Sequence, residues 1–188
     1  MRLFVAANLA SDQLVQLRGK VEEAQIAAPV EGIRWLPETN WHATLAFIGE
    51  REPSELRDIE SAIDQVVARF ERLAVRPHRI QAMPHRSQPR LLALKAAADP
   101  PIQELYFQLG RAFAIKDRQR EFRFHVTVAR FRELTGDAAR AFNEAIKDLS
   151  MIEAKEWILP SVSLFDSTLS QEGASYRTIR TWNLVTST

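Results

Sequence analysis

Two of the four histidines lie in short segments that echo each other. Residues 41–48 read Trp-His-Ala-Thr-Leu-Ala-Phe-Ile, and residues 124–131 read Phe-His-Val-Thr-Val-Ala-Arg-Phe. Each segment runs through an aromatic residue, a histidine, an apolar residue, a threonine, an apolar residue and an alanine. His42 therefore corresponds to His125, and both segments have the alternating character of a half-buried β-strand.

In a strand, residues two apart point to the same face and lie about 6.5–7 Å from each other. Thr44 therefore shares a face with His42, and Thr127 shares a face with His125. The same alternation predicts that Phe47 points to the opposite, apolar face. Two such strands brought together would place two imidazoles and two hydroxyls in one site.

These groups favour acid–base chemistry on an anionic substrate. Imidazole gives and takes a proton near neutral pH, and a threonine hydroxyl can donate a hydrogen bond to an anionic oxygen. Two histidines in opposite protonation states suit a phosphodiester that is attacked in line, with fixed donors for the developing charge. Arginine binds phosphate well, and five arginines surround the second segment: Arg118, Arg120, Arg123, Arg130 and Arg132.

The composition excludes several other kinds of chemistry. The 188 residues are 46% hydrophobic and 26% charged with a net charge of +1, so no strong field forces binding to nucleic acid or a membrane. The absence of cysteine excludes a disulfide scaffold, a thiolate nucleophile and a cysteine zinc site. The glycines form neither a phosphate-binding loop nor a dinucleotide fingerprint, and no apolar run approaches the roughly 20 residues that span a bilayer.

The elements that must position the two segments mix helices and strands without strict alternation. Several predicted strands follow one another directly, which favours an α+β fold with antiparallel sheets. No low-complexity linker divides the chain, so we expect one domain over residues 1–188. Periodicity predicts helices over 11–28, 53–70, 100–113 and 138–149, and seven strands over 2–9, 41–48, 73–83, 90–97, 122–131, 155–166 and 175–184, with a short extended piece at 33–36.

The paired motifs resemble the His-x-Thr-x signatures of the 2H phosphoesterase superfamily. Nearly the whole chain is similar to the bacterial and archaeal RNA 2′,3′-cyclic phosphodiesterases, also called 2′-5′ RNA ligases. The supporting stretches are RLFVAANL at the start, IRWLPETN before the first motif, RLLALKAA in the centre and VSLFDSTLSQEGASYRTIRTW near the end.

The resemblance implies a bilobal α+β fold in which two antiparallel sheets line a central cleft and helices cover the outer faces. Each of the two similar lobes would contribute one motif. The activity implied is hydrolysis of RNA 2′,3′-cyclic phosphate ends to 2′-phosphomonoesters, with no cofactor and no metal. His42 would be the proton donor and His125 the proton acceptor, with Thr44 and Thr127 binding the substrate. The reverse steps, with a 5′-hydroxyl in place of water, would give minor 2′-5′ ligation.

Two further positions are candidate substrate-binding residues. Arg130 matches a basic position that the family often shows after its second motif, yet strict alternation places it opposite His125, so it reaches the phosphate only if the strand ends or twists. Phe47 is a candidate for stacking a nucleobase, because family sites often use an aromatic residue near the first motif. Phe124 stands where the family commonly has proline, and we expect little effect from this difference.

The sequence leaves three functions open. The chain could hydrolyse RNA ends, or it could act on 2′,5′-oligoadenylate or a small cyclic nucleotide such as ADP-ribose 1″,2″-cyclic phosphate, or it could bind RNA ends without catalysis. A zinc site that uses His78 or His85 lacks a short-spaced pair of ligands. We expect Trp41 in the core. We also expect a cytoplasmic monomer whose partners are RNA with 2′,3′-cyclic phosphate ends or cyclic nucleotides, with no membrane association and no obligate protein partner.

Overall fold

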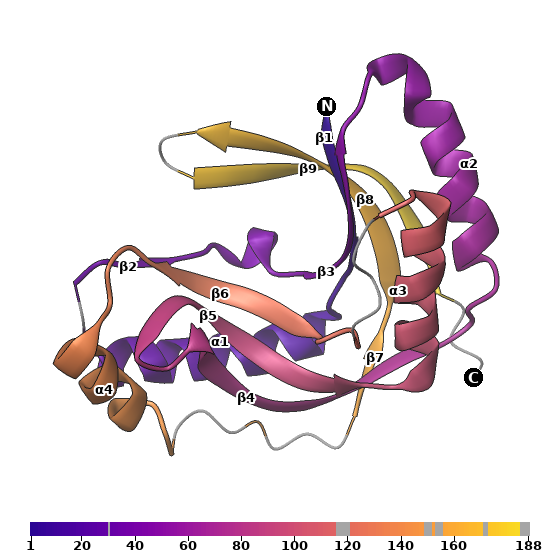
Figure 1. The fold of residues 1–188 in the computed structure, drawn as a ribbon. Helices are drawn as coiled ribbons and strands as arrows, with labels where there is room; N and C mark the ends of the chain where they lie inside the picture. The colour runs from indigo at the N-terminus through magenta and orange to yellow at the C-terminus, as the bar shows by residue number, and fades with distance from the viewer. Residues whose placement is uncertain (30, 116–120, 149–151, 153–155, 171–172, 185–188) are drawn as a thin grey trace.

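Two antiparallel sheets meet at an angle, and helices cover their outer faces (Figure 1). This computed structural model describes residues 1–188 except 30, 116–120, 149–151, 153–155, 171–172 and 185–188. The helices are α1 (Ser11–Ala27), α2 (Leu56–Val67), α3 (Pro100–Ala112) and α4 (Gly136–Ala145). The strands are β1 (Arg2–Ala7), β2 (Ile33–Trp35), β3 (Ala43–Glu50), β4 (Leu73–His85), β5 (Gln88–Ala98), β6 (His125–Phe131), β7 (Trp157–Leu159), β8 (Ser161–Ser170) and β9 (Gly173–Asn183).

The chain passes back and forth between the two sheets. One sheet has four strands in the order β3-β1-β8-β9, and the other has five in the order β2-β6-β5-β4-β7. Every neighbouring pair in both sheets is antiparallel. Because β3 belongs to the first sheet and β6 to the second, the two sequence motifs stand in different sheets, and these two strands contact each other.

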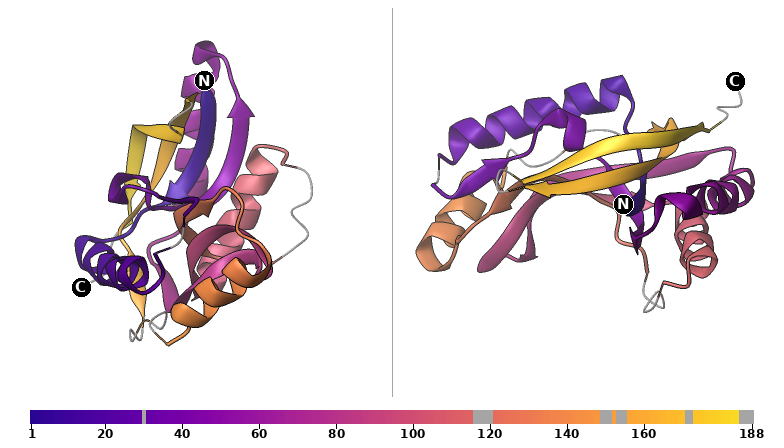
Figure 2. Two further views of the ribbon diagram at one scale, coloured as in Figure 1. Left: turned by 90° about the vertical axis from the view of Figure 1, so that its left-hand side faces the viewer. Right: turned by 90° about the horizontal axis from the view of Figure 1, so that it is seen from above.

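Helix packing follows the apolar stripes of the sequence. In α1 the buried residues Leu17, Val21 and Ala24 recur at helical spacing, so that one side faces the core and the other faces solvent. The helices α2 and α3 lie side by side at the end of the molecule opposite α4, and α3 also contacts β3 (Figure 2). The Asp99 side chain caps α3 by accepting a hydrogen bond from the Ile102 backbone N–H. None of the helices in the described part of the chain is long and apolar enough to cross a membrane.

The α+β class and all four predicted helices are confirmed, whereas the predicted number of strands is wrong. The described residues contain nine strands where the periodicity predicted seven. The extended piece at 33–36 pairs with β6 and becomes β2. The predicted strand over 155–166 is interrupted at Pro160, which cannot donate a backbone hydrogen bond to a sheet. Its first part, β7, joins the five-stranded sheet, and its second part, β8, joins the four-stranded sheet.

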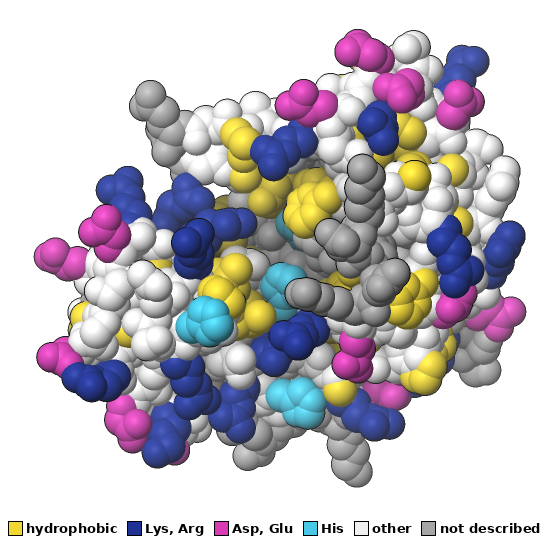
Figure 3. Space-filling model, viewed as in Figure 1, with side chains coloured by type: hydrophobic (Ala, Val, Ile, Leu, Met, Phe, Trp, Pro, Cys, Tyr) yellow, Lys and Arg dark blue, Asp and Glu magenta, His cyan; other side chains and the backbone are white. Residues whose placement is uncertain are grey.

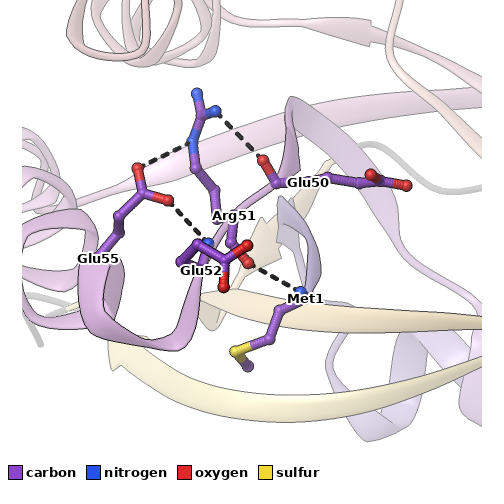
Figure 4. A network of polar contacts seen from close by, with 5 residues as sticks. All are labelled: Met1, Glu50, Arg51, Glu52 and Glu55. Atoms are coloured by element: carbon purple, nitrogen blue, oxygen red, sulfur yellow. Dashed lines mark hydrogen bonds and ion pairs between the residues drawn. The ribbon is translucent and has the colours of Figure 1, made fainter.

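A polar network holds together the end of β3 and the start of α2 (Figure 4). The Met1 ammonium group donates a hydrogen bond to the Arg51 carbonyl oxygen at 2.8 Å, and the Arg51 backbone N–H donates one back to Met1. The Glu55 carboxylate accepts from the Glu52 backbone N–H at 2.8 Å and lies 3.9 Å from the Arg51 guanidinium. These contacts close the corner where the chain leaves β3, at the end of the strand far from its histidine.

Candidate active site

The structure brings all six candidate residues into one cleft between the sheets. The cleft has a volume of about 990 Å³, and histidine side chains lie in the hollow that Figure 3 shows on this face. The four-stranded sheet contributes the first motif and the five-stranded sheet the second. The candidates that line the cleft are His42, Thr44, Phe47, His125, Thr127 and Arg130.

Both histidines stand where a strand begins, each next to a buried aromatic residue. His42 directly precedes β3, which begins at Ala43, two residues later than the predicted start, and His125 is the first residue of β6. The preceding residues, Trp41 and Phe124, are 7% and 1% exposed and lie in the main core, as predicted for Trp41. The Trp41 indole N–H also donates to the Leu36 carbonyl oxygen at 3.1 Å. Each aromatic residue thus fixes the backbone from which the next imidazole projects.

A β-bulge in β6 turns Arg130 into the cleft. In the pairing with β5, Leu92 lies opposite Ala129 and Ala93 opposite Thr127, so Val128 is an extra residue without a partner. Val128 and Ala129 are consequently both buried, and the alternation resumes with Arg130 on the same face as Thr127. The expectation from strict alternation, that this arginine faces away from the second histidine, is wrong because the extra residue shifts the period by one.

The first motif also contains a β-bulge. In the pairing of β3 with β1, Val5 lies opposite Ala46 and Ala6 opposite Thr44, which leaves Leu45 as the extra residue. Leu45 and Ala46 are both buried, and Phe47 emerges on the cleft side with 66% of its surface exposed. The prediction that Phe47 points to the apolar face is therefore wrong. Because the extra residue stands at the same place in both motifs, the two backbones correspond over six positions from each histidine. Phe47 in the first motif corresponds to Arg130 in the second.

Three aromatic rings surround His42. Its ring centroid lies 5.0 Å from that of Phe4, 5.5 Å from that of Phe165 and 5.1 Å from that of Tyr176. This burial lowers the pKa of His42 to about 4, against the opposing effect of a hydrogen bond with the Asn40 backbone, and the proximity of His125 lowers it further. His42 is thus held mainly as neutral imidazole in the free protein at neutral pH.

No sequence signal points to these aromatic neighbours. Phe4, Phe165 and Tyr176 lie outside both motifs, and none of them is marked as a site residue by a local pattern. They reach His42 because β1, β8 and β9 follow β3 in the sheet, with Phe4 directly opposite Phe165. Only this strand order, which connects residues far apart in the chain, assembles the cage.

The hydrogen bond of His125 defines which ring nitrogen faces the cleft. Its Nδ1 lies 2.9 Å from the Arg123 carbonyl oxygen. A carbonyl oxygen can only accept, so Nδ1 carries a hydrogen and the neutral ring keeps its lone pair on Nε2. His42 makes the corresponding bond to the backbone of Asn40, also two residues earlier. Each imidazole is therefore held by the backbone two residues before it, just ahead of its strand.

The charge of the cleft lining is mainly positive. Arg2, Arg123 and Arg130 line it, against the single carboxylate Glu121 among the described residues. Such a lining attracts an anionic substrate. Within the described ranges, no three His, Asp or Glu side chains lie close enough together to hold a metal ion, and His78 and His85 lie outside the cleft lining.

Comparison with known proteins points to phosphoesterases. The sequence profile of the family described as "LigT like Phosphoesterase" matches residues 6–93, which include the first motif. An RNA 2′,3′-cyclic phosphodiesterase of Methanocaldococcus jannaschii is 21% identical over 188 residues, covering 97% of this chain and 100% of that protein.

Solved structures share the fold over the whole chain. The crystal structure of TT0787 of Thermus thermophilus superposes with a TM-score of 0.77 at 23% identity and covers 100% of both chains. The structure of Escherichia coli LigT complexed with 3′-AMP superposes with a TM-score of 0.69 at 19% identity and covers 98% of both chains. At these identities the likeness establishes the arrangement of sheets and helices.

Proposed function

We propose that this chain is a LigT-like phosphoesterase of the 2H superfamily and that it hydrolyses RNA 2′,3′-cyclic phosphate ends to 2′-phosphomonoesters. The observation that carries the proposal is the meeting of two His-x-Thr motifs, from two different sheets, in one cleft. The similarity to an archaeal RNA 2′,3′-cyclic phosphodiesterase and to a LigT that binds 3′-AMP supports this choice of substrate.

In this mechanism His125 is the proton acceptor. Its Nδ1–H is committed to the Arg123 carbonyl oxygen, so the Nε2 lone pair is free to take a proton from water. The water oxygen attacks phosphorus as this proton leaves, and a bond forms between them. The P–O3′ bond breaks on the opposite side of the phosphorus.

His42 is the proton donor to the departing 3′ oxygen. With a pKa of about 4, the His42 imidazolium gives up its proton more readily than a free imidazolium does. In the free protein, however, little of the imidazolium form is present at pH 7. The negative charge of a bound phosphate favours the imidazolium and opposes the burial that lowers the pKa. We therefore expect the bound phosphate to raise the pKa of His42, so that the imidazolium forms when substrate is bound.

The remaining residues bind the substrate. The Thr44 and Thr127 hydroxyls donate to the non-bridging phosphate oxygens, and Arg130 offers two parallel N–H groups to the same oxygens. Phe47, exposed at the cleft, stacks on the nucleobase of the terminal nucleotide. A 5′-hydroxyl that takes the place of water reverses the reaction and joins two RNA ends through a 2′-5′ bond, as a minor activity because water is abundant.

Turnover in EDTA tests the proposal. The substrates are a 2′,3′-cyclic mononucleotide, a short RNA with a 2′,3′-cyclic end, ADP-ribose 1″,2″-cyclic phosphate and 2′,5′-oligoadenylate. We expect a 2′-phosphate product from the RNA, and a loss of a hundredfold or more in kcat for His42→Asn and His125→Asn. The matched control is His85→Asn, since His85 is exposed at the end of β4 and lies outside the cleft lining.

Each other outcome contradicts part of the proposal. Turnover of only ADP-ribose 1″,2″-cyclic phosphate or 2′,5′-oligoadenylate moves the function to another 2H activity. Binding of the RNA end without turnover supports a non-catalytic module. Equal activity in wild type and both cleft variants removes the two histidines from the mechanism.

A further inference from the structure

A row of basic side chains crosses the five-stranded sheet beside His125. In the strand pairing, Lys95 of β5 lies opposite His125, and Arg79 of β4 lies opposite Lys95. The next residues along the three strands, Val126, Leu94 and Ile80, are completely buried, so the row stands on the open face of the sheet. Neighbouring strands are spaced roughly 4.8 Å apart, so the backbone of Arg79, two strands away, lies roughly 10 Å from the backbone of His125.

This row is unfavourable for the protein by itself. Like charges directly opposite each other on neighbouring strands repel. Within the described part of the chain, neither Arg79 nor Lys95 forms an ion pair with a carboxylate. An anion placed over the row would relieve the repulsion.

A groove of about 610 Å³ lies over this row. Glu121, Phe122 and Arg123 line both this groove and the catalytic cleft, so the two hollows adjoin at these residues. Figure 3 shows Lys and Arg side chains gathered over β4 and β5 beside the hollow. We call it the cationic groove, and its charged or titratable lining residues are His78, Arg79, Arg86, Lys95, Glu121 and Arg123.

We propose that the cationic groove binds backbone phosphates of the RNA on the 5′ side of the reacting nucleotide. The inference rests on the proposed function and follows from the chemistry of the substrate. A 2′,3′-cyclic phosphate occupies the 3′ end, so the rest of the RNA extends from its 5′ side. Arg79 stands two strands away from His125 and lines the groove, not the cleft, so it is positioned for a phosphate further along the strand. The cleft thus recognises the end, and the groove distinguishes an oligonucleotide from a mononucleotide.

The test compares two substrates and two arginines. Arg79→Gln removes a half-buried charge from the groove. Arg57→Gln, the control, removes a charge from α2 that lines neither hollow. We measure kcat/KM for a 2′,3′-cyclic mononucleotide and for a five-nucleotide RNA with a 2′,3′-cyclic end. With Arg79→Gln we expect kcat/KM to fall roughly fivefold for the RNA and to stay within about twofold for the mononucleotide. The salt dependence for the RNA should become shallower, by roughly 0.7 in the log–log slope, because the variant neutralises one phosphate fewer.

The outcomes separate this inference from the proposed function. If the mononucleotide and the RNA lose kcat/KM equally, or if neither does while wild type hydrolyses both, the groove does not bind RNA and the proposed function stands. If wild type hydrolyses neither substrate, the proposed function fails. The groove is then tested by anisotropy with a fluorescent five-nucleotide single-stranded RNA: weaker binding by Arg79→Gln but not by Arg57→Gln supports it, and equal binding by both overturns it.

Discussion

The aromatic cage around His42 should make the stability of the protein depend on pH in a defined window. Burial against Phe4, Phe165 and Tyr176 lowers the pKa of His42 to about 4, from the ordinary value of 6.5 that applies in the unfolded chain. Between these two values the unfolded chain binds a proton at His42 that the folded protein does not. The free energy of unfolding therefore falls as the pH falls from about 6.5 to about 4.

The size of the effect follows from the difference between the two pKa values. Complete titration corresponds to about 3 kcal/mol, of which about 2.5 kcal/mol is lost by pH 4.5. Above pH 7 the group contributes no such difference, because it is neutral in both states. His42→Asn cannot take up this proton. Relative to wild type, the variant should therefore gain about 2.5 kcal/mol of stability between pH 7.5 and pH 4.5.

Urea unfolding at pH 7.5, 6.0, 5.0 and 4.5 measures this difference. Titrating groups that do not interact with His42 are common to both proteins, so they cancel in the comparison. Thr127→Val is the matched control, since it changes a cleft residue without removing a titratable group and should follow wild type at every pH. A constant offset between His42→Asn and wild type across the four pH values would refute the argument that the cage keeps this imidazole neutral.

Three further predictions concern the cleft and its wall. Phe47→Ala should raise KM for a 2′,3′-cyclic mononucleotide roughly tenfold through loss of base stacking. Because Phe47 is 66% exposed, the free energy of unfolding should change by less than about 0.5 kcal/mol, and a drop in stability without a change in KM would show it to be a packing residue. Arg130→Lys keeps the charge but loses the planar pair of donors, so steady-state kinetics should show kcat/KM falling roughly tenfold; undiminished activity would mean that charge alone suffices. Gly173→Ala should lower the free energy of unfolding by about 1–2 kcal/mol in urea, since Gly173 has a φ of +128°, a backbone conformation in which alanine is strained. Unchanged stability would show that the β8–β9 hairpin relaxes at no cost.

The sequence alone determined the local part of this protein. The repeated His-x-Thr pattern located both motifs, and alternation assigned His42 and Thr44 to one face, with His125 and Thr127 likewise paired. The apolar stripes located all four helices. Each of these inferences depends on residues within a few positions of one another, where the periods of strand and helix leave few choices.

The tertiary structure decided which residues complete the site. Phe47 and Arg130 enter the cleft because Leu45 and Val128 are extra residues in their strands, and a residue is extra only relative to the partner strand. The cage around His42 likewise depends on which strands follow β3 in the sheet. The same holds for the row of Arg79 and Lys95 beside His125, which exists through strand pairing. The period of a single strand carries no record of its neighbours, so these contacts are determined only when the sheets assemble.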